Sequence, residues 1–131
     1  MTIPFWTLLV AVFLPFVWFT VEALSRRKTA DGLDANHPRL QEANLKGLAA
    51  RAHGATCNAF EAITLYVPAV ITAHLFAPDS KLAPTLALVW VAARVLHGVV
   101  YLANIPPART ALFSVGMISV LGLFLIGGHV L

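Results

Sequence analysis

The chain has 131 residues, of which 59% are hydrophobic and only 11% are charged, whereas soluble domains carry about a quarter charged residues. The mean hydropathy is +0.80. A net charge of +3 spread over a largely apolar chain excludes a nucleic-acid-binding module, and a single cysteine excludes an internal disulfide scaffold. The sequence predicts one all-α domain over residues 1–131, an integral membrane bundle of about four transmembrane helices.

The first predicted helix covers about residues 3–24 and carries no charge before Glu22. No lysine or arginine precedes it and its apolar run is longer than that of a secretory signal, so we interpret it as a retained membrane helix. Pro15 predicts a kink. The basic cluster that begins at Arg26 is expected to end the helix. Glu22 is expected to snorkel or to pair with Arg26; a role at a trimer interface is the alternative.

Three further helices are predicted over about residues 40–76, 82–103 and 108–131. The first turns of the second one are polar, so we expect that helix to begin outside the bilayer. A turn at residues 77–80 separates the second helix from the third, because Pro and Asp initiate turns. Residues 104–107 end the third helix, and their two prolines suit the first turn of the fourth.

The basic residues predict the orientation in the membrane. Only Lys81 lies in the second connection. The first and third connections share a side in a four-helix topology. Counted up to the membrane entry of the second helix, they hold seven basic residues: Arg26, Arg27, Lys28, Arg39, Lys46, Arg51 and Arg109. We therefore expect these connections in the cytoplasm and both termini outside.

Polar side chains inside the predicted spans form the candidate site, because an ionisable group in a bilayer costs about 2.5–3.5 kcal/mol on insertion scales. They gather on two helical faces and at one helix start: Arg51, Asn58 and Glu61 on the second helix, Arg94, His97 and Tyr101 on the third, and Arg109 at the start of the fourth. The antiparallel directions of the second and third helices predict that these faces meet in the cytoplasmic half.

Such a set suits a zwitterionic ligand with several carboxylates and an amine, because guanidiniums bind carboxylates bidentately and Glu61 can bind an ammonium group. In the alternative interpretation, Glu61 and Arg94 simply neutralise each other and hold two helices together. His53, Cys57 and Glu61 form a stripe with metal-ligand chemistry, but zinc would need one more ligand, so no metal site is predicted. Cys57 is instead interpreted as a small buried packing residue.

Two motifs resemble the signatures of the MAPEG family, the membrane-associated proteins in eicosanoid and glutathione metabolism. The stretch Arg51-Ala-His-Gly-Ala-Thr-Cys-Asn58-Ala-Phe-Glu61, with Tyr66-Val-Pro68 after it, is similar to the second-helix signature. The stretch Arg94-Val-Leu-His97-Gly-Val-Val-Tyr101, followed by Pro-Pro-Ala-Arg109, is similar to the third-helix signature and to the arginine that opens the fourth helix. The resemblance covers nearly the whole chain and looks most like the short bacterial branch. One position departs from the family pattern: Gly54 stands where the family carries an arginine, one turn before the asparagine.

The resemblance implies a homotrimer in the bacterial inner membrane, with glutathione bound between subunits near the cytoplasmic face and a lipophilic substrate arriving through the membrane lipid. Asn58 and Glu61 would hold polar groups of glutathione, with Glu61 at its amino group. The remaining ligand-binding residues would be Arg51, Arg94, His97 and Tyr101. Arg109 would face the sulfur and favour the thiolate, and no metal or redox cofactor is implied.

The implied function is a glutathione-dependent transferase or peroxidase that acts on a lipophilic electrophile or a lipid hydroperoxide. Arg109 favours this enzyme. The alternative is a non-catalytic lipid- or glutathione-binding membrane protein of the same fold, which Gly54 favours.

Overall fold

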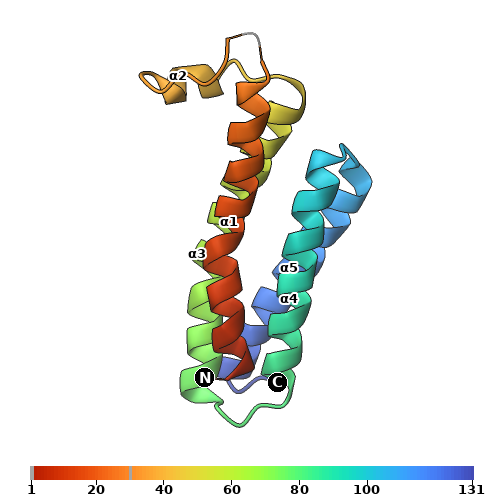
Figure 1. Cartoon of the computed structure of the whole chain (residues 1–131). Helices are drawn as coiled ribbons and strands as arrows, with labels where there is room; N and C mark the ends of the chain where they lie inside the picture. The colour runs from red at the N-terminus through yellow and green to blue at the C-terminus, as the bar shows by residue number, and fades with distance from the viewer. Residues whose placement is uncertain (1, 30) are drawn as a thin grey trace.

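The structure, a computed structural model, describes residues 2–29 and 31–131. The described part contains five helices: α1 (Ile3–Arg27), α2 (Pro38–Glu42), α3 (Gly47–Phe76), α4 (Leu82–Leu102) and α5 (Pro106–Gly127). All of them except α2 are long and apolar enough to cross a membrane. Both termini lie at the end of the bundle opposite α2 (Figure 1).

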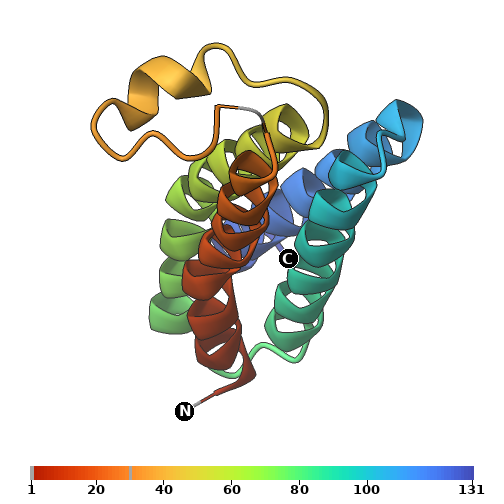
Figure 2. The ribbon, with the colours of Figure 1, turned by 45° about the horizontal axis from the view of Figure 1, so that its top comes forward.

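The four long helices pack as two pairs that are joined through α3. α1 packs along α3 and α4 packs along α5, while α3 also contacts α4 and α5, and α1 contacts α4. The segment that carries α2 connects the first pair and stands out from the end of the bundle (Figure 2). α3 therefore contacts each of the other three long helices.

The interior of the half nearest the termini is filled by stacked rings and small residues. The rings of Tyr66 and Trp90 stack with centroids 3.6 Å apart, and the hydroxyls of Tyr66 and Thr7 share a hydrogen bond of 2.5 Å. Alanines on α3 and α4 are buried around them, because small side chains let membrane helices approach closely. The indole of Trp90 is 2% exposed, since it fills the space that these alanines leave.

One predicted helix is interrupted in the structure. The segment expected to form a single helix over residues 40–76 is split into α2 and α3 by residues 43–46. Lys46 is extended, with φ −131° and ψ 162°, and Gly47 has a φ of +59°, a conformation that favours glycine. The helix that carries the candidate site therefore begins at Gly47.

Two helix ends also differ from the prediction. α1 ends within the basic cluster, as expected, but it extends through Arg27, beyond the predicted end at about residue 24. The side chain of Arg26 in this added turn is buried and hydrogen bonded rather than solvated. α5 ends at Gly127 rather than at the last residue, since His129 turns the chain with a φ of +56°.

Arg26 connects α1 to the α2 segment. Its Nη1 donates to Glu22 Oε1 at 3.1 Å and lies 3.7 Å from Glu42 Oε1. Its Nε and Nη2 donate to Gln41 Oε1 at 3.0 and 2.5 Å. The predicted pairing of Glu22 with Arg26 is confirmed. The second carboxylate oxygen of Glu22 lies 3.3 Å from Nδ1 of His53 on α3. These contacts join α1, the α2 segment and α3, and we call the five residues that make them the loop clasp: Glu22, Arg26, Gln41, Glu42 and His53.

Candidate functional site

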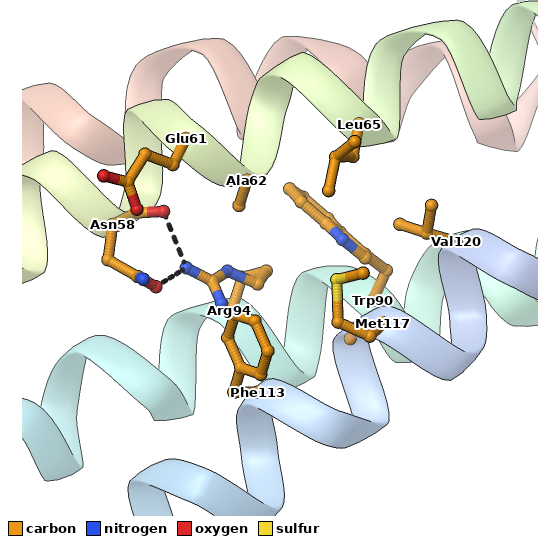
Figure 3. Close-up of a pocket in the computed structure, with 10 residues that line it drawn as sticks. Asn58, Glu61, Ala62, Leu65, Trp90, Arg94, Phe113, Met117 and Val120 are labelled. Atoms are coloured by element: carbon orange, nitrogen blue, oxygen red, sulfur yellow. Dashed lines mark hydrogen bonds between the residues drawn. The ribbon is translucent and has the colours of Figure 1, made fainter.

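The first of two adjoining cavities has a volume of about 190 Å³ and lies between α3, α4 and α5 (Figure 3). Its polar end is formed by Asn58, Glu61 and Arg94, and the rest is apolar. The remaining lining residues are Ala62, Leu65, Trp90, Phe113, Gly116, Met117 and Val120. The cavity thus offers charged groups at one end and an apolar wall beyond them.

The second cavity has a volume of about 270 Å³ and is lined by Asn58, His97, Tyr101, Arg109, Thr110 and Phe113. It shares Asn58 and Phe113 with the first cavity. Together the two cavities bring together all of the predicted site residues except Arg51. Phe113 was not predicted from the sequence, although its position one helical turn after Arg109 places it on the same face.

Arg94 is the most deeply buried charge of the site, with 4% of the residue exposed. Its Nη2 donates to Asn58 Oδ1 at 2.5 Å and to the Asn58 carbonyl at 3.1 Å, as Figure 3 shows. Its Nε is buried and has no hydrogen-bond partner among the described residues. A buried donor without a partner is costly, so Arg94 retains capacity for a further acceptor.

The expected alternative, in which Glu61 and Arg94 neutralise each other, is not what the structure contains. No ion pair joins them in the described part of the chain. Glu61 lies one turn beyond Asn58 on α3 and remains exposed, while the amide of Asn58 takes the guanidinium instead. Glu61 is therefore free of Arg94.

Aromatic contacts hold Arg109 and His97 at the second cavity. The guanidinium carbon of Arg109 lies 4.5 Å from the centroid of the Tyr101 ring, within the range of a cation–π interaction. The rings of His97 and Tyr101 meet edge to face at 5.7 Å. No carboxylate pairs with Arg109 among the described residues, so the Tyr101 ring is the contact that orients its charge.

Gly54 makes room for Tyr101. A Cβ at this position would lie 2.5 Å from the Tyr101 hydroxyl and 2.9 Å from the ring carbon that bears it. Any other residue at position 54 would therefore push the tyrosine away from α3. The glycine that stands in place of the family arginine at position 54 thus leaves space, and the ring of Tyr101 occupies that space.

Arg51 lies outside both cavities. Its Nε donates to the carbonyl of Leu102 at 2.9 Å, and Leu102 is the last residue of α4. This bond satisfies a carbonyl that a helix end leaves free. In the structure Arg51 therefore ties α3 to the end of α4.

The stripe of possible metal ligands does not form one site. Cys57 was expected to be buried but is exposed, because its position on α3 points away from the neighbouring helices. Its Sγ lies 3.5 Å from His53 Nε2, whereas Glu61 is not close to them. Within the described residues, the group that could hold a metal is Glu22, Glu42 and His53, and Arg26 already bonds to or approaches both carboxylates. These residues belong to the loop clasp.

The comparisons with known proteins assign the family. A family model described as the MAPEG family matches residues 3–129. Neither a curated protein nor a solved structure gives a significant match. The matched region contains all four membrane-spanning helices and both cavities, which confirms the resemblance seen in the two motifs. The chain therefore belongs to the MAPEG family.

Proposed function

We propose that this protein is a membrane-bound glutathione-dependent transferase or peroxidase that acts on a lipophilic electrophile or a lipid hydroperoxide. Membership of the MAPEG family fits a glutathione-related membrane protein. The observation that carries the proposal is the guanidinium of Arg109, half-buried, held by the Tyr101 ring and unpaired with any described carboxylate. A fixed and unpaired positive charge at a cavity is what stabilises a thiolate.

In this proposal glutathione uses the polar ends of the two cavities. Arg94 receives a carboxylate of the tripeptide, because its unpartnered Nε and its charge suit such an acceptor. Glu61 binds the amino group, since it is exposed at the cavity and free of Arg94. Asn58 lines both cavities and contacts the peptide between them. The sulfur then lies near Arg109, with His97 and Tyr101 beside it.

The chemistry begins with loss of the thiol proton to water. As a transferase, the thiolate attacks an electrophilic carbon, forms a carbon–sulfur bond and releases a leaving group or, after addition, takes up a proton. As a peroxidase, the thiolate attacks a hydroperoxide oxygen, the oxygen–oxygen bond breaks, and the alkoxide takes up a proton and leaves as an alcohol. The sulfenic acid of glutathione that this step forms then reacts with a second glutathione to give the disulfide and water. Both routes need the same stabilised thiolate.

We propose that the protein assembles as a homotrimer, as the family resemblance implies, and the exposure of Glu61 supports an assembly of more than one chain. This carboxylate lies within a membrane-spanning helix and is uncovered in the single chain, which is costly in lipid. We propose that a neighbouring subunit covers it and completes the ligand site, and that the lipophilic substrate enters from the surrounding bilayer. Native mass spectrometry in detergent should show trimers, and a population of monomers or dimers alone would contradict the assembly.

The proposed location is the bacterial inner membrane, with the α2 end of the bundle in the cytoplasm and both termini outside. The support is the distribution of basic residues, seven against one between the two ends. A topology reporter fused after Leu131 should therefore give an extracytoplasmic signal. A cytoplasmic signal would invert the orientation and the side from which glutathione enters.

A second candidate function is a non-catalytic lipid- or glutathione-binding protein of the same family. The observation that favours it is Gly54, because the site has one guanidinium fewer than the family pattern supplies. The neutral ring of Tyr101 stands in that space. Turnover measurements separate this candidate from the enzyme, since both predict binding but only the enzyme converts a substrate.

The experiment compares Arg109→Ala with Glu61→Ala. Loss of Arg109 should raise the pKa of bound glutathione by about one to two units, because a nearby positive charge favours the thiolate. Turnover near neutral pH should then fall roughly ten- to hundredfold with a smaller effect on affinity. Glu61→Ala should weaken glutathione binding first, because it removes a ground-state contact.

The measurements are glutathione affinity, thiolate absorbance and turnover of a model electrophile and of a lipid hydroperoxide. Unchanged thiolate formation and turnover in Arg109→Ala would remove the proposed role of that residue. A parent protein that binds glutathione but converts neither substrate would establish the binding protein instead.

A further inference from the structure

A separate groove lies on the outside of the bundle, where α1 ends and α3 begins. Its volume is about 440 Å³, and it is lined by Val21, Leu24, Ser25, Lys28, Thr29, Lys46, Leu48 and Ala49. It shares no residue with the two cavities of the candidate site. Within one chain the groove is therefore separate from the cavities assigned to glutathione.

Two lysines from different segments converge on this groove. Lys28 directly follows the last residue of α1, and Lys46 directly precedes the first residue of α3. Both are exposed, and neither forms an ion pair with a described residue. The groove therefore carries two positive charges that no carboxylate of the described chain neutralises.

The rest of the groove is mostly apolar. Leu24 and Leu48 are both exposed large hydrophobic residues, and Val21 lies one turn before Leu24 on α1. Because α1 crosses the bundle from Ile3 to Arg27, Val21 and Leu24 lie deeper along the membrane span than Lys28 at its end. If α1 crosses the membrane, the lysines lie near its surface, and Val21 and Leu24 lie below them.

We propose that this groove binds an anionic phospholipid, whose phosphate contacts Lys28 and Lys46 and whose acyl chain covers Leu24 and Leu48. Basic residues next to a membrane helix attract anionic lipids, and the positions of charge and apolar surface match those of headgroup and chain. A free phosphate would neutralise the lysines but leave the leucines uncovered. The groove volume also lies within the range of sites that hold a small molecule.

The test is native mass spectrometry of the detergent-purified protein, incubated with equal amounts of phosphatidylglycerol and phosphatidylcholine of the same acyl chains. The parent should retain phosphatidylglycerol preferentially. Lys28→Gln/Lys46→Gln should bind it roughly ten- to thirtyfold more weakly, the loss expected when two basic residues near an anionic surface are neutralised. Both lysines are exposed, so the variant should remain folded, and Lys28→Arg/Lys46→Arg should restore the preference.

The matched control is Arg27→Gln/Arg39→Gln, which removes the same charge at the same end of the molecule without touching the groove. It should keep the preference for phosphatidylglycerol. An equal loss in this control would mean diffuse attraction rather than a groove, and retention of the lipid by the double lysine variant would overturn the proposal. Complete displacement of the lipid by millimolar inorganic phosphate would also overturn it, because the apolar half would then contribute nothing.

Discussion

The loop clasp around Arg26 and the candidate site around Arg94 each bury a guanidinium, with 2% and 4% of the residue exposed. Arg26 bonds to the carboxylate of Glu22, the amide of Gln41 and the carbonyl of Pro38. Arg94 bonds only to Asn58 and keeps a buried Nε without a partner in the described chain. Every nitrogen of the Arg26 guanidinium is hydrogen bonded within the protein, whereas the guanidinium of Arg94 is not fully bonded by the described residues.

We infer from this difference that the charge of Arg26 stabilises the fold and that the charge of Arg94 is available to a ligand. A buried ion stabilises its surroundings only when opposite charge and hydrogen bonds compensate its lost hydration. In the loop clasp, Glu22 and Gln41 compensate the charge of Arg26, and these contacts connect α2 to α1. The Arg94 site does not meet this condition, which is why we assign the ligand to Arg94 rather than to Arg26.

The largest effect is expected from breaking the loop clasp. Arg26→Ala should destabilise the protein by about 3–5 kcal/mol, because it leaves the carboxylate of Glu22 buried without its partner. Thermal unfolding in detergent measures this loss. Arg27→Ala, at the exposed neighbouring position, should change stability by no more than about 0.5 kcal/mol.

A double variant sharpens the same comparison. Glu22→Gln/Arg26→Met should recover much of the stability lost in Arg26→Ala, since no isolated charge then remains buried. If Arg26→Ala instead unfolds at the temperature of the parent, the loop clasp does not hold the fold.

A smaller effect is expected at the candidate site from Gly54→Ala. The added Cβ would lie 2.5 Å from the Tyr101 hydroxyl, and such overpacking costs about 1–3 kcal/mol. Displacement of Tyr101 should also release Arg109 from its ring and lower turnover. Gly116→Ala is the matched control for stability, because its Cβ would meet nothing closer than 3.4 Å. Equal unfolding temperatures of the two variants, or unchanged turnover of Gly54→Ala, would mean that Gly54 does not position Tyr101.

The smallest effect concerns pH and Asp34 in the connection before α2. The N–H groups of His37 and Asn36 donate to Asp34 Oδ1 at 3.0 and 2.8 Å, and these bonds hold the pKa of the Asp34 carboxyl below its ordinary value. A carboxyl with a lowered pKa stabilises the folded form above its ordinary pKa, and this contribution is lost as the pH falls through the lowered value.

Hydrogen exchange of residues 31–37 should therefore quicken in strong acid, relative to the intrinsic rate, while the helices keep their protection. Asp34→Ala should show the faster relative exchange already at neutral pH. Protection that is the same in the parent and the variant at every pH would show that Asp34 does not order this connection.

The sequence predicted the membrane spans well because their signal is hydropathy, which depends on composition and not on partners. The interruption before Gly47 was missed, because polar residues at 41–46 suit a protruding helix as well as a loop, and only the backbone of Lys46 and Gly47 reveals the break. Trp18 and Trp90 are buried, although tryptophans of membrane proteins are often found at the membrane–water interface. Their burial depends on Gly98 and Tyr66 from other parts of the chain.

The residues of the candidate site could be grouped by helical spacing, since polar groups within a span are few and share a face, and all of them except Arg51 line the two cavities. The hydrogen-bond partners of these residues could not be predicted in the same way. The alternative interpretation from charge was a contact between Glu61 and Arg94, whereas the structure pairs Arg94 with the amide of Asn58. The fit of Tyr101 against Gly54 could not be foreseen, because it depends on how two helices approach each other.

The most direct test of the account is the binding of glutathione to the purified protein, measured by isothermal titration calorimetry in detergent. The parent should bind, and Arg94→Leu should bind roughly tenfold or more weakly, because a hydrogen-bonded charge is lost from the ligand site. Arg51→Leu, a variant of the arginine outside both cavities, should retain the affinity of the parent. No binding by the parent, or equal affinity in Arg94→Leu, would contradict the assignment of the unsaturated guanidinium to a ligand.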